Sequence, residues 1–237
     1  TREMKILIVS LFNYFFKNIK KILKPVKWYD LRKTKPISNV FGLDRGTPID
    51  RFYIEDFLYK NKSLIKGKCC EISENSYTKK FGTKNCISEI LHHNNDNKKA
   101  TIVGDLSKIE TLPKNTIDCF ILTQTLNFIY DYESAVKGLY QILNTNGVGL
   151  ITVSGISQIS KYDYDRWGDY WRFTDLSIKK LFESVFGKNN IEVSTYGNVL
   201  AATAFLHGVS AEELSIGELL ENDINFQLTI AVKATKL

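Results

Sequence analysis

Short apolar runs alternate with helical patterns along most of this chain, and this rhythm constrains the fold more than any other feature. Strand-like runs, often bounded by glycine or polar residues, occupy residues 67–73, 85–93, 98–106, 117–122, 148–155, 190–197 and 225–236. Helical spacing of apolar residues begins near Ile49 and recurs over 133–147, where Asn144–Gly147 is expected to close the helix, and over 176–187. Strands separated by helices predict an α/β sheet of mostly parallel strands.

The last two strand-like runs break this rhythm. No clear helical pattern separates residues 190–197 from residues 225–236. Strands that follow one another without a crossover helix pair antiparallel. We therefore expect these two strands to form an antiparallel pair that closes one edge of the sheet.

Cysteine usage indicates a reducing compartment. The four cysteines lie mostly in apolar, strand-like runs and form no CxxC pair: Cys69, Cys70, Cys86 and Cys119. Cysteines in such positions are typical of small buried side chains rather than of a disulfide framework. The sequence thus predicts a cytoplasmic protein, with peripheral attachment to the inner face of a membrane left open.

The positive charge of the chain is concentrated in residues 1–40. This segment holds ten Lys and Arg residues against Glu3 and Asp30, a net charge of +8, whereas the whole chain carries +6. The remaining body is therefore slightly acidic, which disfavours nucleic-acid binding by the body. The charge distribution predicts a basic amphipathic N-terminal arm, residues 1–40, and one catalytic-type domain, residues 41–237.

The arm has two readings. Its apolar run, from Ile6 to Phe16, is too short to span a bilayer. A basic amphipathic stretch with Trp28 and Tyr29 at its end suits either an anionic membrane surface or packing against the body or a partner protein. Both alternatives remain open at this level.

The middle of the chain resembles class I S-adenosylmethionine-dependent methyltransferases, in particular the type 11-like group. The likeness rests on Asp105 after a strand, on Leu112-Pro113, on the apolar run from Asp118 to Leu122 and on Asn146-Gly147 before the next strand. The resemblance implies a Rossmann-like fold with a mostly parallel seven-stranded sheet, one antiparallel strand near the edge and helices on both faces. The stretches at 41–58 and 162–174 resemble a branch associated with bacterial glycan synthesis.

The resemblance implies S-adenosylmethionine as the cofactor and assigns residues to it. Asp105 would accept the adenine amine, and Glu71 would organise the turn beneath the methionine portion. The other residues implied at the cofactor are Ser73, Leu106, Thr123, Gln124 and Asn127. The turn after the first strand lacks the usual glycines, since none occurs between Gly67 and Gly82. Adenosylmethionine has no phosphates, so Ser73, Asn75 and Ser76 remain compatible with a binding turn.

An acidic residue after the second strand, the usual ribose contact in this family, is not evident. His92-His93 end that strand instead, without further ligands at metal spacing, so we expect no metal site and leave the ribose contact unassigned.

A dense cluster of rings and charges follows the fifth strand, over residues 161–175. Aromatic faces beside Arg and Asp suit a sugar or another polar acceptor, and the alternative is a packed surface loop. The predicted acceptor contacts are Arg45, Tyr162, Trp167, Tyr170 and Arg172. Asp169 is the first candidate for the catalytic base and His207 the second.

These patterns predict methyl transfer to a hydroxyl of a sugar or glycan-linked acceptor. The alternative is an inactive methyltransferase-like domain that serves as a binding or scaffold module.

Overall fold

The computed structural model describes residues 12, 15, 19, 27 and 29–237. The chain divides into two units, Thr1–Pro36 and Ile37–Leu237. Most of the predicted arm lies outside the described residues, and the boundary at residue 40 stays a prediction. No helix in the described part of the chain combines the length and the apolar character needed to cross a membrane.

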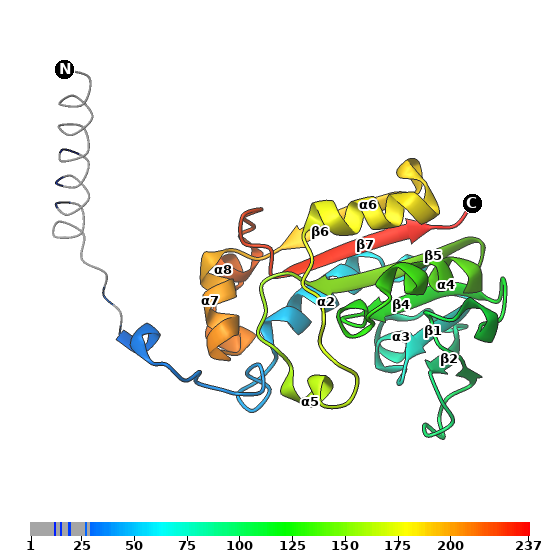
Figure 1. Cartoon of the computed structure of the whole chain (residues 1–237), viewed down its shortest axis with the longest axis horizontal. Coiled ribbons are helices and arrows are strands. Elements are labelled where there is room, and N and C mark those ends of the chain that lie inside the picture. The colour runs from blue at the N-terminus through cyan, green and yellow to red at the C-terminus, as the bar shows by residue number, and fades with distance from the viewer. Residues whose placement is uncertain (1–11, 13–14, 16–18, 20–26, 28) are drawn as a thin grey trace, which may run out of the picture. The chain divides into compact units, whose positions relative to one another are not determined.

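A seven-stranded sheet forms the centre of the second unit (Figure 1). The strand order is β3-β2-β1-β4-β5-β7-β6. Strand β7 runs antiparallel to both of its neighbours, and the other neighbouring strands pair parallel. The strands are β1 (Lys68–Ile72), β2 (Ile87–His92), β3 (Ile102–Val103), β4 (Ile117–Thr123), β5 (Leu143–Ser154), β6 (Ile191–Tyr196) and β7 (Thr229–Thr235). The predicted fold class is confirmed.

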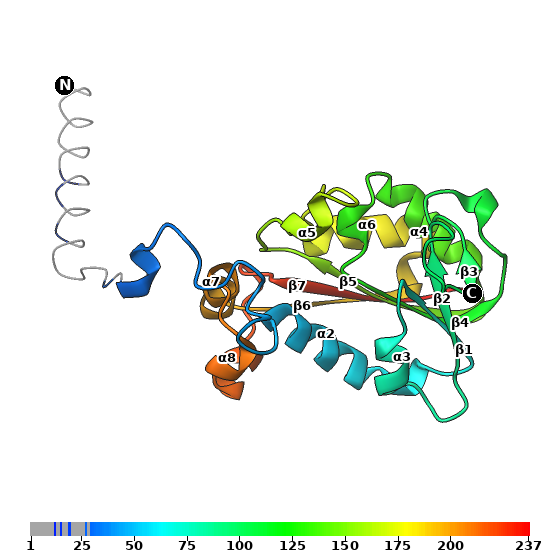
Figure 2. The same ribbon diagram turned by 90° about the horizontal axis from the view of Figure 1, so that it is seen from below.

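Helices cover both faces of the sheet (Figure 2). One face carries α2 (Ile49–Lys60) and α3 (Ser76–Phe81), and the other carries α4 (Tyr132–Ile142) and α6 (Asp175–Phe186). The remaining helices are α5 (Lys161–Tyr164), α7 (Val199–His207), α8 (Ile216–Leu220) and short 3₁₀ turns, of which the first is η1 (Tyr29–Arg32).

The strand sequences explain this two-sided covering. In β4, Phe120 and Leu122 pack into the cluster under α4 and α6, whereas Cys119 and Ile121 pack into the cluster under α2. Because successive side chains of a strand point to opposite faces, a strand covered on both sides needs a continuous apolar run. The run from Ile117 to Leu122 is of this kind, and Asp118 is its one polar member.

Two details differ from the sequence-based expectation. Asn144–Gly147 does not close a helix, because α4 ends at Ile142 and these residues bulge from β5 between the pairs Leu143↔Ile117 and Val148↔Cys119. Helices α7 and α8 do separate β6 from β7. The sequence of α7, VLAATAFLH, is apolar on nearly every side, so it shows no amphipathic period that would reveal a helix.

Candidate functional site

A cavity of about 840 Å³ opens at the carboxyl ends of the parallel strands. Its wall includes residues that follow β1, β2, β3, β4 and β5, together with the start of α2. The crevice at which the strand order reverses, here between β1 and β4, is where open α/β sheets bind ligands. The position of the cavity therefore marks it as the functional site.

The turn after β1 keeps the backbone shape of a glycine turn without a glycine. Ser73 lines the cavity with a φ of 63°, in the left-handed region that most residues avoid. Its N–H donates to the carbonyl of Leu91, and its own carbonyl accepts a 2.7 Å hydrogen bond from Asn97. These bonds hold the serine in a strained conformation, which is typical of functional sites.

Glu71 supports this turn from below. Its carboxylate is buried and accepts hydrogen bonds from the backbone N–H groups of Tyr77 (3.1 Å) and Thr78 (2.6 Å), in the first turn of α3. Burial raises the pKa of Glu71, and its hydrogen bonds to Thr78 oppose this shift. Glu71 itself is not among the cavity-lining residues, so its contribution is to fix α3 and the preceding turn against β1.

Asp105 follows β3, two strands away from β1, and lines the cavity there. One carboxylate oxygen accepts from the N–H and the hydroxyl of Ser107, and the other lies 3.7 Å from the ammonium of Lys108. The same segment places Leu106 in the cavity wall, where it is 3% exposed. Asp105 thus presents a carboxylate at a strand end, where the sequence predicts the adenine contact.

The residues after β4 lie beside the turn after β1, because β4 pairs with β1 on the side away from β2. Thr123, Gln124 and Asn127 all line the cavity. Gln124 has a φ of 47°, and its side-chain carbonyl accepts from Ser154 while its Nε2 is buried without a described hydrogen-bond partner. An amide donor left unpaired in a buried position is costly, so the side chain of Gln124 is held in place by its hydrogen bond with Ser154.

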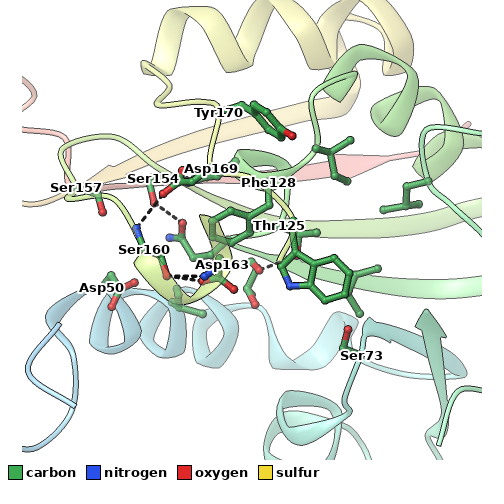
Figure 3. A pocket seen from close by; sticks show the side chains of 18 of the residues that line it. Asp50, Ser73, Thr125, Phe128, Ser154, Ser157, Ser160, Asp163, Asp169 and Tyr170 are labelled. Carbon is green, nitrogen blue, oxygen red and sulfur yellow. Dashed lines mark hydrogen bonds between the residues drawn. The ribbon is translucent and has the colours of Figure 1, made fainter. Parts of the chain in front are cut away.

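The loop after β5 lines the cavity next to the residues after β4, and Asn127 connects these two segments. The carbonyl of Asn127 accepts the N–H groups of Tyr170 (2.9 Å) and Trp171 (3.2 Å). The guanidinium of Arg172 donates two hydrogen bonds, of 2.5 and 3.0 Å, to the carboxylate of Asp169. The N–H of Ser160 donates to the same carboxylate. Figure 3 shows this loop above the start of α2, where Asp50 lies.

These hydrogen bonds bear on the prediction that Asp169 is the catalytic base. Its side chain is 1% exposed, and both carboxylate oxygens already accept from donors of the protein. Because both oxygens are occupied by donors of the protein, the geometry favours a structural contribution of Asp169 over the predicted base.

Three other predicted residues do not line the cavity. His207 is the last residue of α7, where its carbonyl accepts the N–H groups of Ile37 and Ser38. Arg45 pairs with Glu213 on the surface. Tyr162 is 66% exposed and stacks under the guanidinium of Arg166. By contrast, Trp167, Tyr170 and Arg172 all line the cavity.

Several lining residues were not assigned from sequence. They come from the end of β2, the end of β5 and the loop that follows β5: His92, His93, Ser154, Ser157, Gln158, Ser160 and Asp163. The signal for the histidines was available, because they end a predicted strand at the edge that carries the ligand. The sequence offers Asp50 and Arg51, at the start of α2, either as contacts at this mouth or as partners of each other, and both line the cavity.

Comparisons with known proteins agree with this architecture. A family model described as a methyltransferase domain matches residues 81–151, from the end of α3 into β5. No curated protein matches the chain.

The solved structures show the fold at low sequence identity. A SAM-dependent methyltransferase from Thermotoga maritima has 16% identity and a TM-score of 0.51, with 80% of this chain and 91% of that chain covered. One from Aquifex aeolicus has 12% identity and a TM-score of 0.50, with coverages of 85% and 98%. One from Archaeoglobus fulgidus has 12% identity and a TM-score of 0.50, with coverages of 78% and 94%.

The cavity residues also fit S-adenosylmethionine chemically. The Asp105 carboxylate suits the adenine amine, and Thr123 and Asn127 add polar side chains to the cavity wall. No group of three or more His, Cys, Asp or Glu side chains in the described residues is arranged to hold a metal ion. The methyltransferase-domain match, on this fold, confirms the prediction of an S-adenosylmethionine-dependent methyltransferase.

Proposed function

We propose that the chain transfers a methyl group from S-adenosylmethionine to a hydroxyl of a sugar or glycan-linked acceptor. The observation that carries this proposal is the loop after β5, where Tyr170 and Arg172 line the cavity beside the hydroxyl-rich segment Ser157–Ser160. Aromatic faces, guanidinium groups and hydroxyls are the side chains that recognise sugar rings and their hydroxyl groups. Tyr170 is 50% exposed and packs edge-on against Tyr130, which leaves part of its ring open to a ligand.

Asp50 supports the hydroxyl assignment by offering a proton acceptor. It lines the cavity from the first turn of α2 and accepts a 2.7 Å hydrogen bond from the N–H of Arg51. No described cation lies within salt-bridge distance of it. Burial raises the pKa of Asp50 to about 6, so the group titrates close to neutral pH, where a general base is most effective.

Asp50 differs from two other cavity acids. Asp169 is bound by Arg172, and Asp131 caps α4 through the N–H of Ser134, a hydrogen bond that lowers the pKa of Asp131. S-adenosylmethionine supplies an electrophilic methyl group. The acceptor oxygen forms the new bond to that methyl carbon, the electron pair of the broken bond leaves with sulfur, and Asp50 takes the hydroxyl proton.

The test is a screen for release of S-adenosylhomocysteine in the presence of free sugars, nucleotide sugars and glycan-linked sugars. Matched amines and thiols serve as competing acceptor classes. We expect turnover with a sugar hydroxyl, and loss of that turnover when the corresponding deoxy sugar is supplied. Turnover restricted to amines or thiols would contradict the hydroxyl assignment and leave the enzyme class intact.

A further inference from the structure

The indole of Trp167 rests on the pair of histidines that ends β2. The ring centroids of Trp167 and His93 are 4.9 Å apart at an interplanar angle of 85°, and those of Trp167 and His92 are 6.3 Å apart at 80°. The two imidazoles are themselves 4.6 Å apart. All three residues line the cavity.

This contact crosses the mouth of the cavity. Trp167 belongs to the loop after β5, whereas the histidines follow β2, and the sheet order places β4 and β1 between these strands. Neighbouring strands lie about 4.8 Å apart, so the loop reaches across roughly 14 Å of sheet. Trp167, which is expected to recognise the acceptor, therefore contacts residues beside the expected position of the cofactor.

The sheet order also indicates which part of the cofactor lies beneath the contact of Trp167 with His92 and His93. Asp105 after β3 is expected at the adenine and Ser73 after β1 beneath the methionine portion, and β2 lies between these strands. The ribose connects the adenine to the methionine portion. A cofactor bound in this direction brings its ribose hydroxyls to the end of β2, where an acidic residue is absent and His92 stands.

The hydrogen bonding of His92 defines what it offers a ribose. Its Nδ1 lies 3.2 Å from the carbonyl oxygen of Asn94. A carbonyl oxygen only accepts, so Nδ1 donates and the neutral ring carries its free lone pair on Nε2. No hydrogen bond to Nε2 is recorded in the described part of the chain. Nε2 is therefore available to accept a hydroxyl, as a carboxylate oxygen would.

We propose that His92, His93 and Trp167 form a ribose clamp, in which His92 Nε2 accepts a ribose hydroxyl and Trp167 covers the sugar from the acceptor loop. The proposal rests on the proposed function and reassigns Trp167 from the acceptor to the cofactor. It also gives the clamp a consequence: a bound cofactor lies under the loop that carries Tyr170 and Arg172, so the cofactor precedes the acceptor.

Calorimetry with S-adenosylhomocysteine tests the clamp without an acceptor. His92→Phe keeps an aromatic ring and removes the acceptor nitrogen, so we expect affinity to fall by about 5- to 100-fold, the cost of an unpaired buried hydroxyl. His92→Glu restores an acceptor and should recover most of that loss. Trp167→Ala should weaken binding by about 3- to 30-fold. Tyr164→Ala is the matched control, because Tyr164 is an exposed ring of the same loop outside the cavity.

Analogues of the ligand assign the hydrogen bond. The 2′-deoxy and 3′-deoxy forms of S-adenosylhomocysteine are titrated into the wild type and His92→Phe. One of the two should bind both proteins equally, because the hydroxyl that His92 contacts is already missing. If both deoxy ligands show the same loss in His92→Phe as the parent ligand, the hydrogen bond does not exist and the proposal is overturned.

The free protein provides a readout that needs no ligand. Nitrogen-15 spectra of the histidine rings should show His92 as the Nδ1–H tautomer at pH 8, and an Nε2–H tautomer would contradict the proposal. Wild-type protein that fails to bind S-adenosylhomocysteine would refute the cofactor itself. Wild-type binding with unchanged affinity in His92→Phe and Trp167→Ala would refute only the clamp.

Discussion

Ser73 and Gln124 end the adjacent strands β1 and β4 and share a left-handed backbone, with φ of 63° and 47°. Both residues line the cavity at the point where the strand order reverses. Left-handed geometry costs a non-glycine residue about 1–2 kcal/mol. The two strained turns flank the crevice, so the fold stores strain where the ligand is expected, and neither turn uses a glycine.

Ser73→Gly tests whether the glycine-free turn is equivalent to a glycine turn. We expect the free energy of unfolding to change by less than about 1 kcal/mol, because relief of strain is offset by the larger entropy of the unfolded glycine. Ser73→Val should destabilise the protein by about 1–3 kcal/mol, since a branched side chain tolerates this φ poorly. Chemical denaturation measures both. Equal stability of the valine variant would show that the turn is not strained.

Asp105→Ala should weaken S-adenosylmethionine binding by roughly 1–3 kcal/mol, the cost of leaving a buried donor of the adenine without its partner. Because Asp105 also accepts hydrogen bonds from Ser107, the variant needs a control for local disorder. Ser107→Ala removes one of these contacts and keeps the carboxylate. Calorimetry should show a clear loss in the first variant and a small one in the second. Unchanged affinity in a folded Asp105→Ala protein would remove Asp105 from the site.

Asp50→Asn should raise stability at neutral and alkaline pH. The pKa of Asp50 is raised to about 6 in the folded state from its usual 3.8, so the folded state binds more protons between these values. The free energy of unfolding contributed by this group therefore falls as the pH rises from about 4 to 6. The asparagine variant should lose this decrease and gain roughly 1–3 kcal/mol at pH 8. Urea denaturation across pH 4–8 measures it, with Asp163→Asn as the control.

The same variant tests the proposed proton acceptor. With an acceptor found in the screen, Asp50→Asn should lower turnover by about 10²–10⁴-fold while S-adenosylhomocysteine affinity stays near the wild-type value. The wild-type rate should rise with pH through about 6. Wild-type turnover in Asp50→Asn would exclude the role.

Asp169→Asn should loosen the acceptor loop rather than abolish the chemistry. The substitution removes the carboxylate charge opposite Arg172, and the guanidinium keeps only its hydrogen bonds to the carbonyls of Ser157, Gln158 and Trp171, so we expect a loss of about 1–3 kcal/mol of stability. The kinetic effect should fall mainly on the KM of the acceptor. Lys161→Ala, which breaks an exposed ion pair with Asp165 in the same loop, should have little effect. A large fall in kcat at unchanged KM would restore Asp169 as the base.

Deletion of residues 1–35 should leave a folded body that binds S-adenosylhomocysteine. The deletion keeps Ile37 and Ser38, whose N–H groups bind the carbonyl of His207. We expect cofactor affinity within about twofold of the full chain. If the basic arm attaches the protein to anionic lipid, the full chain should bind such vesicles, the deletion should not, and salt should weaken the attachment. Absence of vesicle binding by the full chain would end the membrane proposal.

The strands of the sheet, and the edge at which polar residues follow them, could be predicted from the sequence. Apolar runs such as Ile117–Leu122 report strands covered on both faces, and a polar residue after such a run falls at the carboxyl edge, as Ser73 and Asp105 do. These signals are local, because they depend on the residues of one strand and the turn that follows it.

Tertiary structure alone decided the rest. The ion pair of Asp169 with Arg172, the approach of Asp50 from α2, and the contact of Trp167 with His92 and His93 depend on how separate segments pack. A residue's protonation and its ligand contacts follow from these neighbours and not from its type. Asp169 and Asp50 are therefore indistinguishable as sequence letters, although one is held by a guanidinium and the other lies free of a described cation at the cavity.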